Sequence, residues 1–276
     1  MAVGEDERSR MGFVFDTIND FKGQKKTRDV LDAKLYYWGE NPTINRYEKM
    51  VYDLEGKAHP DMYTANHKIA SKFFGFVVDQ EVSYLLGNGV AFNKDATKKA
   101  LGATFDEDIM DAARHALIGG QSFVFWNLDH IQVFAPEQFV PLYDEEDGAL
   151  KAGIRFWQID PDKPLRATLY EMDGYTDYIK PRNGEVRSLN GKLPYKLKVR
   201  YSEIDGTEIY DGENYPGFPI IPLKNGEQAR SELCGRKNTV DALDLASSNM
   251  VNNVDEGNLI YWVLTNCGGM DEVDDA

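Results

Sequence analysis

Tyr215-Pro-Gly-Phe-Pro-Ile-Ile-Pro-Leu-Lys-Asn225 ends a β-type region of this chain and leads into a helical pattern. Between Thr239 and Glu256, apolar residues recur at spacings of three and four, which predicts an amphipathic helix with one apolar stripe. The stripe consists of Val240, Leu243, Ala246, Met250 and Val254. Leu259–Leu264 comes next and, rich in strand formers, predicts a strand. Elements of this kind normally pack against a returning element. We therefore expect other chains to cover this surface, or the polypeptide to be the front part of something longer.

The sequence before residue 121 has mainly helical patterns. Helices are predicted at 6–21, 27–38 and 64–86, and a further one begins at Thr104. Thr104-x-x-Glu107 has the spacing of a capping box, in which the two side chains bond to each other's backbone N–H groups. A short strand is predicted at Val90–Phe92, after the glycines that end the helix 64–86.

From Gln121 onward, short runs rich in aromatic and β-branched residues alternate with turn signals such as Asp173-Gly174 and Asn183-Gly184. This pattern is typical of an antiparallel β-meander. The predicted fold class is therefore α+β, with N-terminal helices, a meander and one long helix. We divide the chain into a mainly helical region at 1–120, the meander at 121–235, and a region at 236–276 that contains the long helix and the predicted strand.

Composition excludes several classes of protein. The net charge is −15, from 46 acidic and 31 basic residues, so generic binding to nucleic acid is not expected, because phosphate contact needs a cationic face. The two cysteines, Cys234 and Cys267, provide neither a disulfide framework nor a metal cluster. We find no signal peptide and no apolar stretch of membrane-spanning length, and we expect an intracellular protein that does not bind membranes.

The motifs that would indicate catalysis are incomplete. Gly87-x-Gly89 lacks the third glycine of a dinucleotide fingerprint and ends a helix. Asp160-x-Asp162 lacks the glycine of a calcium loop and is interpreted as a turn. The four histidines fall on different predicted elements without ligand spacing. Lys25-Lys-Thr-Arg28 and Lys196-Leu-Lys-Val-Arg200 are small basic patches, interpreted as a helix start and an outer strand face. We assign no catalytic, cofactor-binding or metal-binding residue and predict that the protein is not an enzyme.

Three segments together carry a resemblance to a known family. The first is Phe76-Val-Val-Asp-Gln-Glu-Val-Ser-Tyr-Leu-Leu-Gly-Asn-Gly-Val-Ala-Phe92, and the second is Phe134-Ala-Pro-Glu-Gln-Phe-Val-Pro-Leu-Tyr-Asp144 with the hairpins after it. The third is Phe218-Pro-Ile-Ile-Pro-Leu-Lys-Asn225, leading into Val240-Asp-Ala-Leu-Asp-Leu-Ala-Ser-Ser-Asn249. In this order the segments resemble the portal proteins, or head–tail connectors, of tailed bacteriophages, in the subgroup common in phages of Gram-positive hosts.

The resemblance implies a structural subunit of a closed ring, dodecameric in the virion, at one vertex of the capsid. Such a ring passes double-stranded DNA through its channel without sequence-specific binding. Its expected partners are the terminase large subunit, head-completion or adaptor proteins, and scaffold or capsid protein. The location implied is the virion, with assembly in the host cytoplasm.

By the same analogy, residues 1–235 correspond to most of the wing region. The helix Thr239–Glu256 corresponds to the first stem helix, and the chain enters the clip at Leu259. The apolar stripe is then the suspected inter-subunit or channel helix surface. Residues 231–276 carry nine acids and two bases, a net charge of −7, which suits a channel wall along which DNA slides. A solvated helix face with a polar tail explains the charge equally well.

A portal of this type continues through a clip, a second stem helix, a long wing helix and a crown, so the resemblance implies that this chain is an N-terminal portion. Two other classes stay open. One is a monomeric phage structural adaptor or binding module, which predicts that the stripe of Thr239–Glu256 is buried against the chain's own meander. The other is a hydrolase with a carboxylate pair between the helical and β regions, which predicts acidic residues of raised pKa in one pocket.

Overall fold

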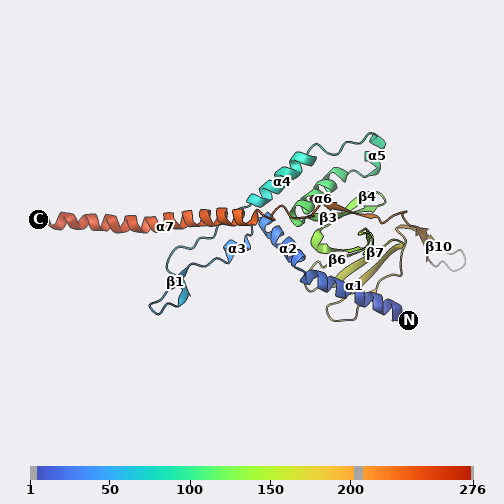
Figure 1. Ribbon diagram of the computed structural model, residues 1–276, viewed down its shortest axis with the longest axis horizontal. Helices are drawn as coiled ribbons and strands as arrows, with labels where there is room; N and C mark the ends of the chain where they lie inside the picture. The colour runs from blue at the N-terminus through green and yellow to red at the C-terminus, as the bar shows by residue number, and fades with distance from the viewer. Residues whose placement is uncertain (1–4, 202–207, 275–276) are drawn as a thin grey trace. The chain divides into compact units, whose positions relative to one another are not determined.

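Figure 1 shows the computed structural model of the protein, which describes residues 5–201 and 208–274. The described chain has two compact units, each built from two separate stretches of sequence. The sheet unit comprises Met1–Ala33 and Val78–Glu232, and the helix unit comprises Lys34–Val77 and Leu233–Ala276. Helices α2 (Lys25–Trp38) and α4 (Phe73–Leu86) each contribute residues to both units.

The sheet unit contains two main antiparallel sheets. One has the strand order β12-β3-β4 and the other the order β5-β6-β7-β8-β9. The strands are β3 (Gln121–Asn127), β4 (His130–Phe134), β5 (Phe139–Tyr143), β6 (Leu150–Trp157), β7 (Leu165–Glu171), β8 (Gly174–Lys180), β9 (Arg187–Ser188) and β12 (Ile220–Lys224). β10 (Lys196–Tyr201) and β11 (Glu208–Glu213) form a separate hairpin. The expected α+β class with an antiparallel meander is confirmed.

Helix α1 (Glu5–Gly23) covers one face of the five-stranded sheet (Figure 1). Its residues Met11, Val14, Phe15 and Ile18 follow the helical spacing of three and four and are buried. They pack on side chains that alternate along the strands, including Ile154 and Leu169. Successive strand residues point to opposite faces of a sheet. The strand residues that alternate with Ile154 and Leu169 therefore face the other side of the sheet, where a second core lies.

An aromatic core lies between the two sheets. It is formed by Phe123, Phe125, Phe134, Phe139, Tyr170, Tyr195 and Ile220. Phe139 is fully buried, and a Cβ at Gly153 on the neighbouring strand would lie 2.1 Å from its ring. Glycine at 153 is therefore what lets the ring pack flat on the sheet.

Helix α6 (Phe105–Gly119) packs on the three-stranded sheet, where the Ser122 hydroxyl donates a 2.7 Å hydrogen bond to the Ala112 carbonyl. Gly120 ends α6 in the left-handed region, with φ of 87°. A short 3-10 helix, η1 (Pro136–Gln138), joins β4 to β5, and α5 (Asp95–Ala100) precedes α6.

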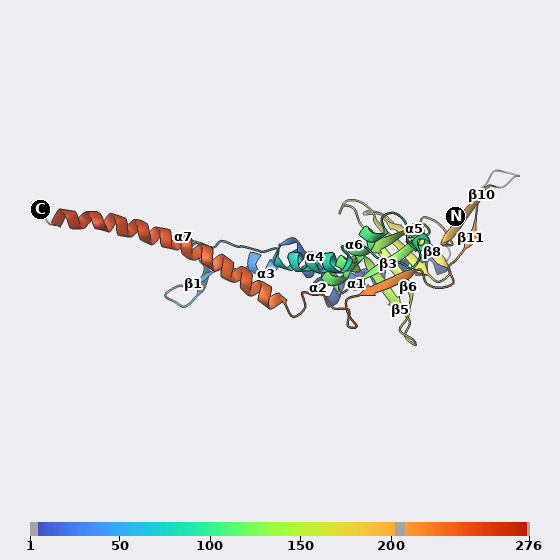
Figure 2. The ribbon, with the colours of Figure 1, turned by 90° about the horizontal axis from the view of Figure 1, so that it is seen from above.

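The helix unit is built around α7 (Lys237–Asp274), which Figure 2 shows as one continuous helix. The unit also contains α3 (Pro42–Asn45) and a hairpin of β1 (Met50–Tyr52) and β2 (Ala58–Pro60). No helix of the described residues has both the length and the apolar character needed to cross a membrane.

Two predicted helix features are wrong. The helix expected over 64–86 begins only at Phe73, and residues 65–72 have no regular secondary structure. The N–H groups of this stretch bond to side chains of α7, so tertiary contacts override the local helical pattern. The capping box at Thr104 is also absent, because the Thr104 hydroxyl donates to Asp108 instead of accepting from a backbone N–H.

Two predicted strands are wrong, and one strand was taken for a connection. Val90–Phe92 forms no strand, and the Val90 N–H donates to Asp106. Leu259–Leu264 lies within α7. Strand propensity depends on packing against neighbouring strands, whereas a helix satisfies the backbone hydrogen-bonding groups within the segment itself. Ile220–Lys224, in the proline-rich stretch, is strand β12. Pro222 is tolerated there because β12 is an edge strand.

Candidate functional site

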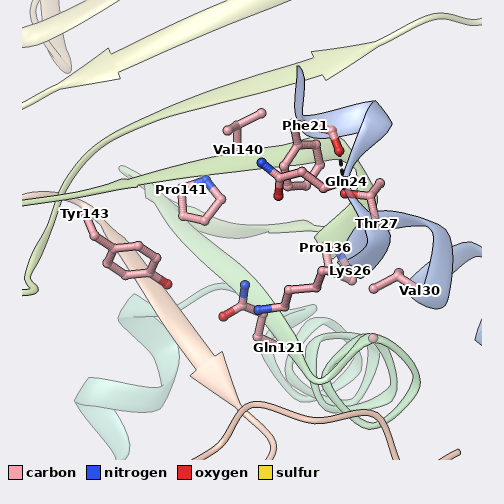
Figure 3. A pocket seen from close by; sticks show the side chains of 11 residues that line it. Phe21, Gln24, Lys26, Thr27, Val30, Gln121, Pro136, Val140, Pro141 and Tyr143 are labelled. Carbon is pink, nitrogen blue, oxygen red and sulfur yellow. Dashed lines mark hydrogen bonds between the residues drawn. The ribbon is translucent and has the colours of Figure 1, made fainter. Parts of the chain in front are cut away.

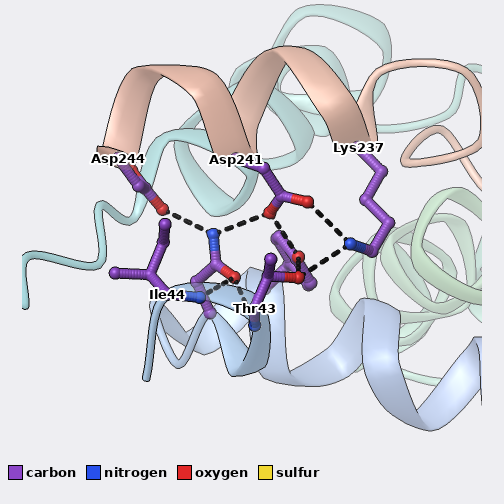
Figure 4. Close-up of polar contacts among 7 residues, drawn as sticks. Thr43, Ile44, Lys237, Asp241 and Asp244 are labelled. Atoms are coloured by element: carbon purple, nitrogen blue, oxygen red, sulfur yellow. Dashed lines mark hydrogen bonds and ion pairs between the residues drawn. The ribbon is translucent and has the colours of Figure 1, made fainter. Parts of the chain in front are cut away.

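The first turns of α7 are anchored in the helix unit by a cluster of polar side chains, shown in Figure 4. Asn41 is at its centre and is 1% exposed. Its side-chain oxygen caps α3, accepting from the N–H groups of Thr43 and Ile44 at 2.9 and 3.3 Å. Its side-chain nitrogen donates to Asp241 at 2.9 Å and to Asp244 at 2.8 Å. One asparagine thus connects the start of α3 to two successive turns of α7.

Asp241 is the most heavily hydrogen-bonded carboxylate of this cluster. It accepts from the Tyr36 hydroxyl at 2.5 Å and from Lys237 at 2.7 Å, in addition to Asn41. Burial disfavours the ionised form, but the hydrogen bonds from Lys237, Tyr36 and Asn41 outweigh it and keep the pKa of Asp241 below its usual value. Burial, and next the bond to Asp241, raise the pKa of Tyr36. The cluster therefore holds a carboxylate and a neutral phenol.

Beyond this cluster, three side chains on one face of α7 hold the segment 67–71, which has no regular secondary structure. Asp244 accepts from the Ser71 N–H at 3.1 Å, Ser248 from the Ile69 N–H at 3.0 Å, and Asn252 from the His67 N–H at 2.7 Å. Four helical residues rise about 6.0 Å, and two extended residues span about 6.6 Å. The four-residue rise of α7 and the two-residue advance of the segment are close enough in length for three successive hydrogen bonds to form. We call these six residues the polar ladder.

The three α7 members of the polar ladder are buried although they are polar. Asp244, Ser248 and Asn252 are 0%, 4% and 3% exposed. Buried polar groups are stable when hydrogen-bonded, and here each accepts a backbone N–H that an irregular segment would otherwise leave unpaired. Further along, His67 contacts Asp255 at 3.2 Å and Lys49 contacts Glu256 at 3.1 Å, both near the surface.

The five residues of the predicted stripe do not share one environment. Val240 is 4% exposed and belongs to the packed side of α7. Leu243, Met250 and Val254 are 44%, 71% and 59% exposed, and Ala246 is exposed as well. At about 100° per residue, Leu243, Met250 and Val254 lie within about 40° of one another around the helix, and the polar ladder lies more than about 80° away. We call Leu243, Ala246, Met250 and Val254 the open stripe.

Sequence reasoning missed Asn41 and the polar ladder. The signal present was the spacing of four between the small polar residues Asp244, Ser248 and Asn252. A search for apolar periodicity passes over such a row, because the helix here buries its polar side. The pattern identified the open stripe but not the face by which α7 is held.

The described residues offer little for chemistry at a metal or a carboxylate pair. Among them, no group of three or more His, Cys, Asp or Glu side chains is placed to hold a metal ion. Each Asp or Glu in this part of the chain whose pKa is displaced has it lowered, as at Asp106 and Asp144, and none has the raised pKa of a general acid. Cys234 is a free, exposed thiol.

Known proteins give a consistent comparison. Residues 22–275 match the sequence model of the family described as "Phage portal protein, SPP1 Gp6-like". The portal protein of Bacillus phage SPP1 is 23% identical over 260 residues, covering 87% of this chain and 49% of that protein. The portal protein of Clostridium phage phiCD119 is 21% identical over 268 residues, covering 89% of this chain and 56% of that protein. The chain spans about half the length of these curated relatives.

Proposed function

The chain belongs to the SPP1 Gp6-like family of phage portal proteins, and we propose that it forms part of the ring at the portal vertex of a capsid. The family identified from the three sequence segments is confirmed. Portal proteins are structural proteins rather than enzymes, so the expectation of a non-enzymatic protein is confirmed by family membership.

The observation that carries the proposal is the inverted burial of α7. Its polar ladder is turned inward, while Leu243, Met250 and Val254 are exposed in the single chain. Neighbours in a closed ring meet through unlike surfaces, so each subunit presents a surface that its own chain does not cover. We propose that neighbouring copies cover the open stripe in the assembled portal.

We assign regions of the portal by analogy with the family. Residues 1–235 would form most of the wing, α7 would provide the first stem helix from Thr239, and the chain would lead toward the clip from Leu259. The net charge of −7 over residues 231–276 would keep DNA from adhering to a channel wall, since like charges repel. Passage of double-stranded DNA, docking of the terminase large subunit and binding of head-completion or adaptor proteins and of scaffold or capsid protein are proposals for the whole portal.

The adaptor alternative required the stripe to be buried against the chain's own meander. Within the helix unit, the hydrogen bonds of the polar ladder join α7 to residues 67–71 through another face, so this unit does not itself cover the open stripe.

Negative-stain electron microscopy of the product of the natural reading frame, read past codon 276, tests the proposal. We expect rings with a central channel. Compact single particles from a frame that ends at Ala276 would contradict it and favour the adaptor. Packaging assays with the corresponding terminase would then test docking and DNA passage.

A further inference from the structure

A cavity of about 160 Å³ lies in the sheet unit beside the N-terminal turn of α2 (Figure 3). Its walls are mainly apolar and come from Phe21, Val30, Pro136, Val140, Pro141 and the ring of Tyr143. An apolar protein cavity of about 150 Å³ can hold a benzene molecule. The cavity therefore has room for one large apolar side chain.

One polar side chain at the cavity is left without a partner. Gln121, the first residue of β3, is 7% exposed and lines the cavity. Among residues 5–201 and 208–274, none forms a hydrogen bond with its side-chain amide. Figure 3 shows Gln121 and Lys26 pointing into the space that Pro141 and Tyr143 border on the other side. The amide is therefore free to pair with a group that enters the cavity.

The mouth of the cavity is positively charged in a chain of net charge −15. Lys26 lines it, and the first turn of α2 contains Lys25 and Lys26 but no acidic residue. Helix N-terminal turns favour anions, so two lysines there are unfavourable unless an anion is present. Within the described chain, Lys26 has no ion-pair partner.

A second cavity of the same unit, about 220 Å³ in volume, is different. Several of its polar side chains are paired with their neighbours. Asp177 accepts from Thr168 and Asn190, and the Tyr195 hydroxyl donates to the Glu171 carbonyl. Arg155 stacks between the rings of Phe134 and Trp157. In the first cavity, by contrast, the side chain of the 7% exposed Gln121 has no partner within the described chain.

We propose that the Gln121 cavity binds a short peptide segment of a partner protein. An apolar side chain of the segment fills the cavity, its peptide group pairs with the Gln121 amide, and a carboxylate next to it meets Lys26. A side-chain amide can match a peptide backbone because its oxygen accepts from an N–H and its NH₂ group donates to a C=O. The carboxylate comes from a chain terminus or from an acidic side chain.

Titration of the ¹⁵N- and methyl-labelled 276-residue chain, followed by nuclear magnetic resonance, tests this site. The probes are N-acetyl-leucine, N-acetyl-leucyl-aspartate amide and N-acetyl-leucinamide, of which only the last has no carboxylate. We expect both carboxylate probes to shift the side-chain NH₂ signals of Gln121 and the methyl signals of Val30 and Val140 at millimolar concentration. Tighter binding of the first probe identifies a chain terminus, and tighter binding of the second identifies an acidic side chain.

Variants separate the two polar contacts. Gln121→Leu is expected to weaken both carboxylate probes about 5- to 10-fold, measured on the valine methyl groups. Lys26→Met is expected to weaken the binding of the carboxylate probes about 2- to 5-fold. N-acetyl-leucinamide should bind the unaltered chain more weakly than the carboxylate probes by the same factor. Lys25→Met, which removes a neighbouring charge outside the cavity, is the matched control and should bind as the unaltered chain does.

Thermal unfolding distinguishes a binding amide from a structural one. Gln121→Leu should keep or raise the unfolding temperature, because the amide has no hydrogen bond within the described chain to lose. Three results would overturn the proposal: no shift at 20 mM probe, equal binding by Gln121→Leu, or an unfolding temperature lowered by several degrees in that variant.

Discussion

In the sheet unit, α1 turns Val14 and Ile18 toward a sheet, whereas in the helix unit α7 turns Asp244, Ser248 and Asn252 inward. Both helices are held, but by different forces. Apolar burial is roughly proportional to area and has no direction, while the polar ladder depends on three hydrogen bonds in register. The sheet unit therefore buries an apolar core of its own, whereas the helix unit buries polar side chains of α7 and leaves the apolar open stripe of that helix exposed.

The largest effect is expected in the apolar core. Phe139→Ala removes a fully buried ring and should lower the free energy of unfolding by about 3–5 kcal/mol. Urea denaturation followed by circular dichroism measures it. Phe13→Ala on α1, where the ring is 53% exposed, is the matched control and should cost far less. Equal losses would mean that the sheet unit is not stabilised by this core.

The next effect tests the polar anchor of α7. Asn41→Ala removes the amide bonded to Asp241 and Asp244 and the cap of α3, and should cost about 2–3 kcal/mol. Hydrogen exchange should show lost protection at the amides of Ile69 and Ser71, while the amides of β6 and β7 stay protected. Asn249→Ala, at an exposed position on α7, should change neither.

Loss of a hydrogen bond to a neutral side chain of the polar ladder should lower the free energy of unfolding less than loss of Asn41. Ser248→Ala removes the acceptor of the Ile69 N–H and should cost about 1 kcal/mol, so the Ile69 amide should exchange about fivefold faster. Ser247→Ala is the control, since the Ser247 hydroxyl bonds only to its own helix, at the Leu243 carbonyl. If both variants behave alike, the polar ladder does not hold the segment 67–71.

Acid should loosen the helix unit through Asp241. Its pKa is lower in the folded chain than the usual 3.8, so its contribution is complete above that value and is lost as the pH falls through the folded pKa. We expect protection of the Tyr36–Asn41 region to fall below about pH 4, with a smaller effect than the substitutions above. Asp241→Asn should flatten this dependence, and an unchanged profile would contradict it.

The parts of the fold predicted from sequence are those set by local pattern. The helical pattern at 6–21 predicted α1, and strand-forming runs between turn signals predicted β3 to β8. The helix predicted over residues 65–72 is wrong because their hydrogen-bond partners are on α7, more than 170 residues away in sequence. The strand predicted at Leu259–Leu264 is wrong because strand propensity depends on neighbouring strands.

The candidate site was predicted in part. Four residues of the apolar stripe are exposed, but Val240 is buried on the packed side, and the polar ladder was not foreseen. The apolar pattern alone does not say which face of a helix the rest of the chain holds. Whether the open stripe contacts neighbouring subunits stays a prediction.

The most direct test compares stability with assembly in the same variants. Met250→Asp and Val254→Asp place charge on the open stripe, and Asn249→Asp places the same charge elsewhere on α7. In the 276-residue chain all three should change the free energy of unfolding by less than about 0.5 kcal/mol, as exposed substitutions do. In the product of the whole reading frame, mass photometry should show rings for Asn249→Asp and none for Met250→Asp or Val254→Asp. Rings in all three would contradict the claim that α7 leaves its apolar face open for neighbouring subunits.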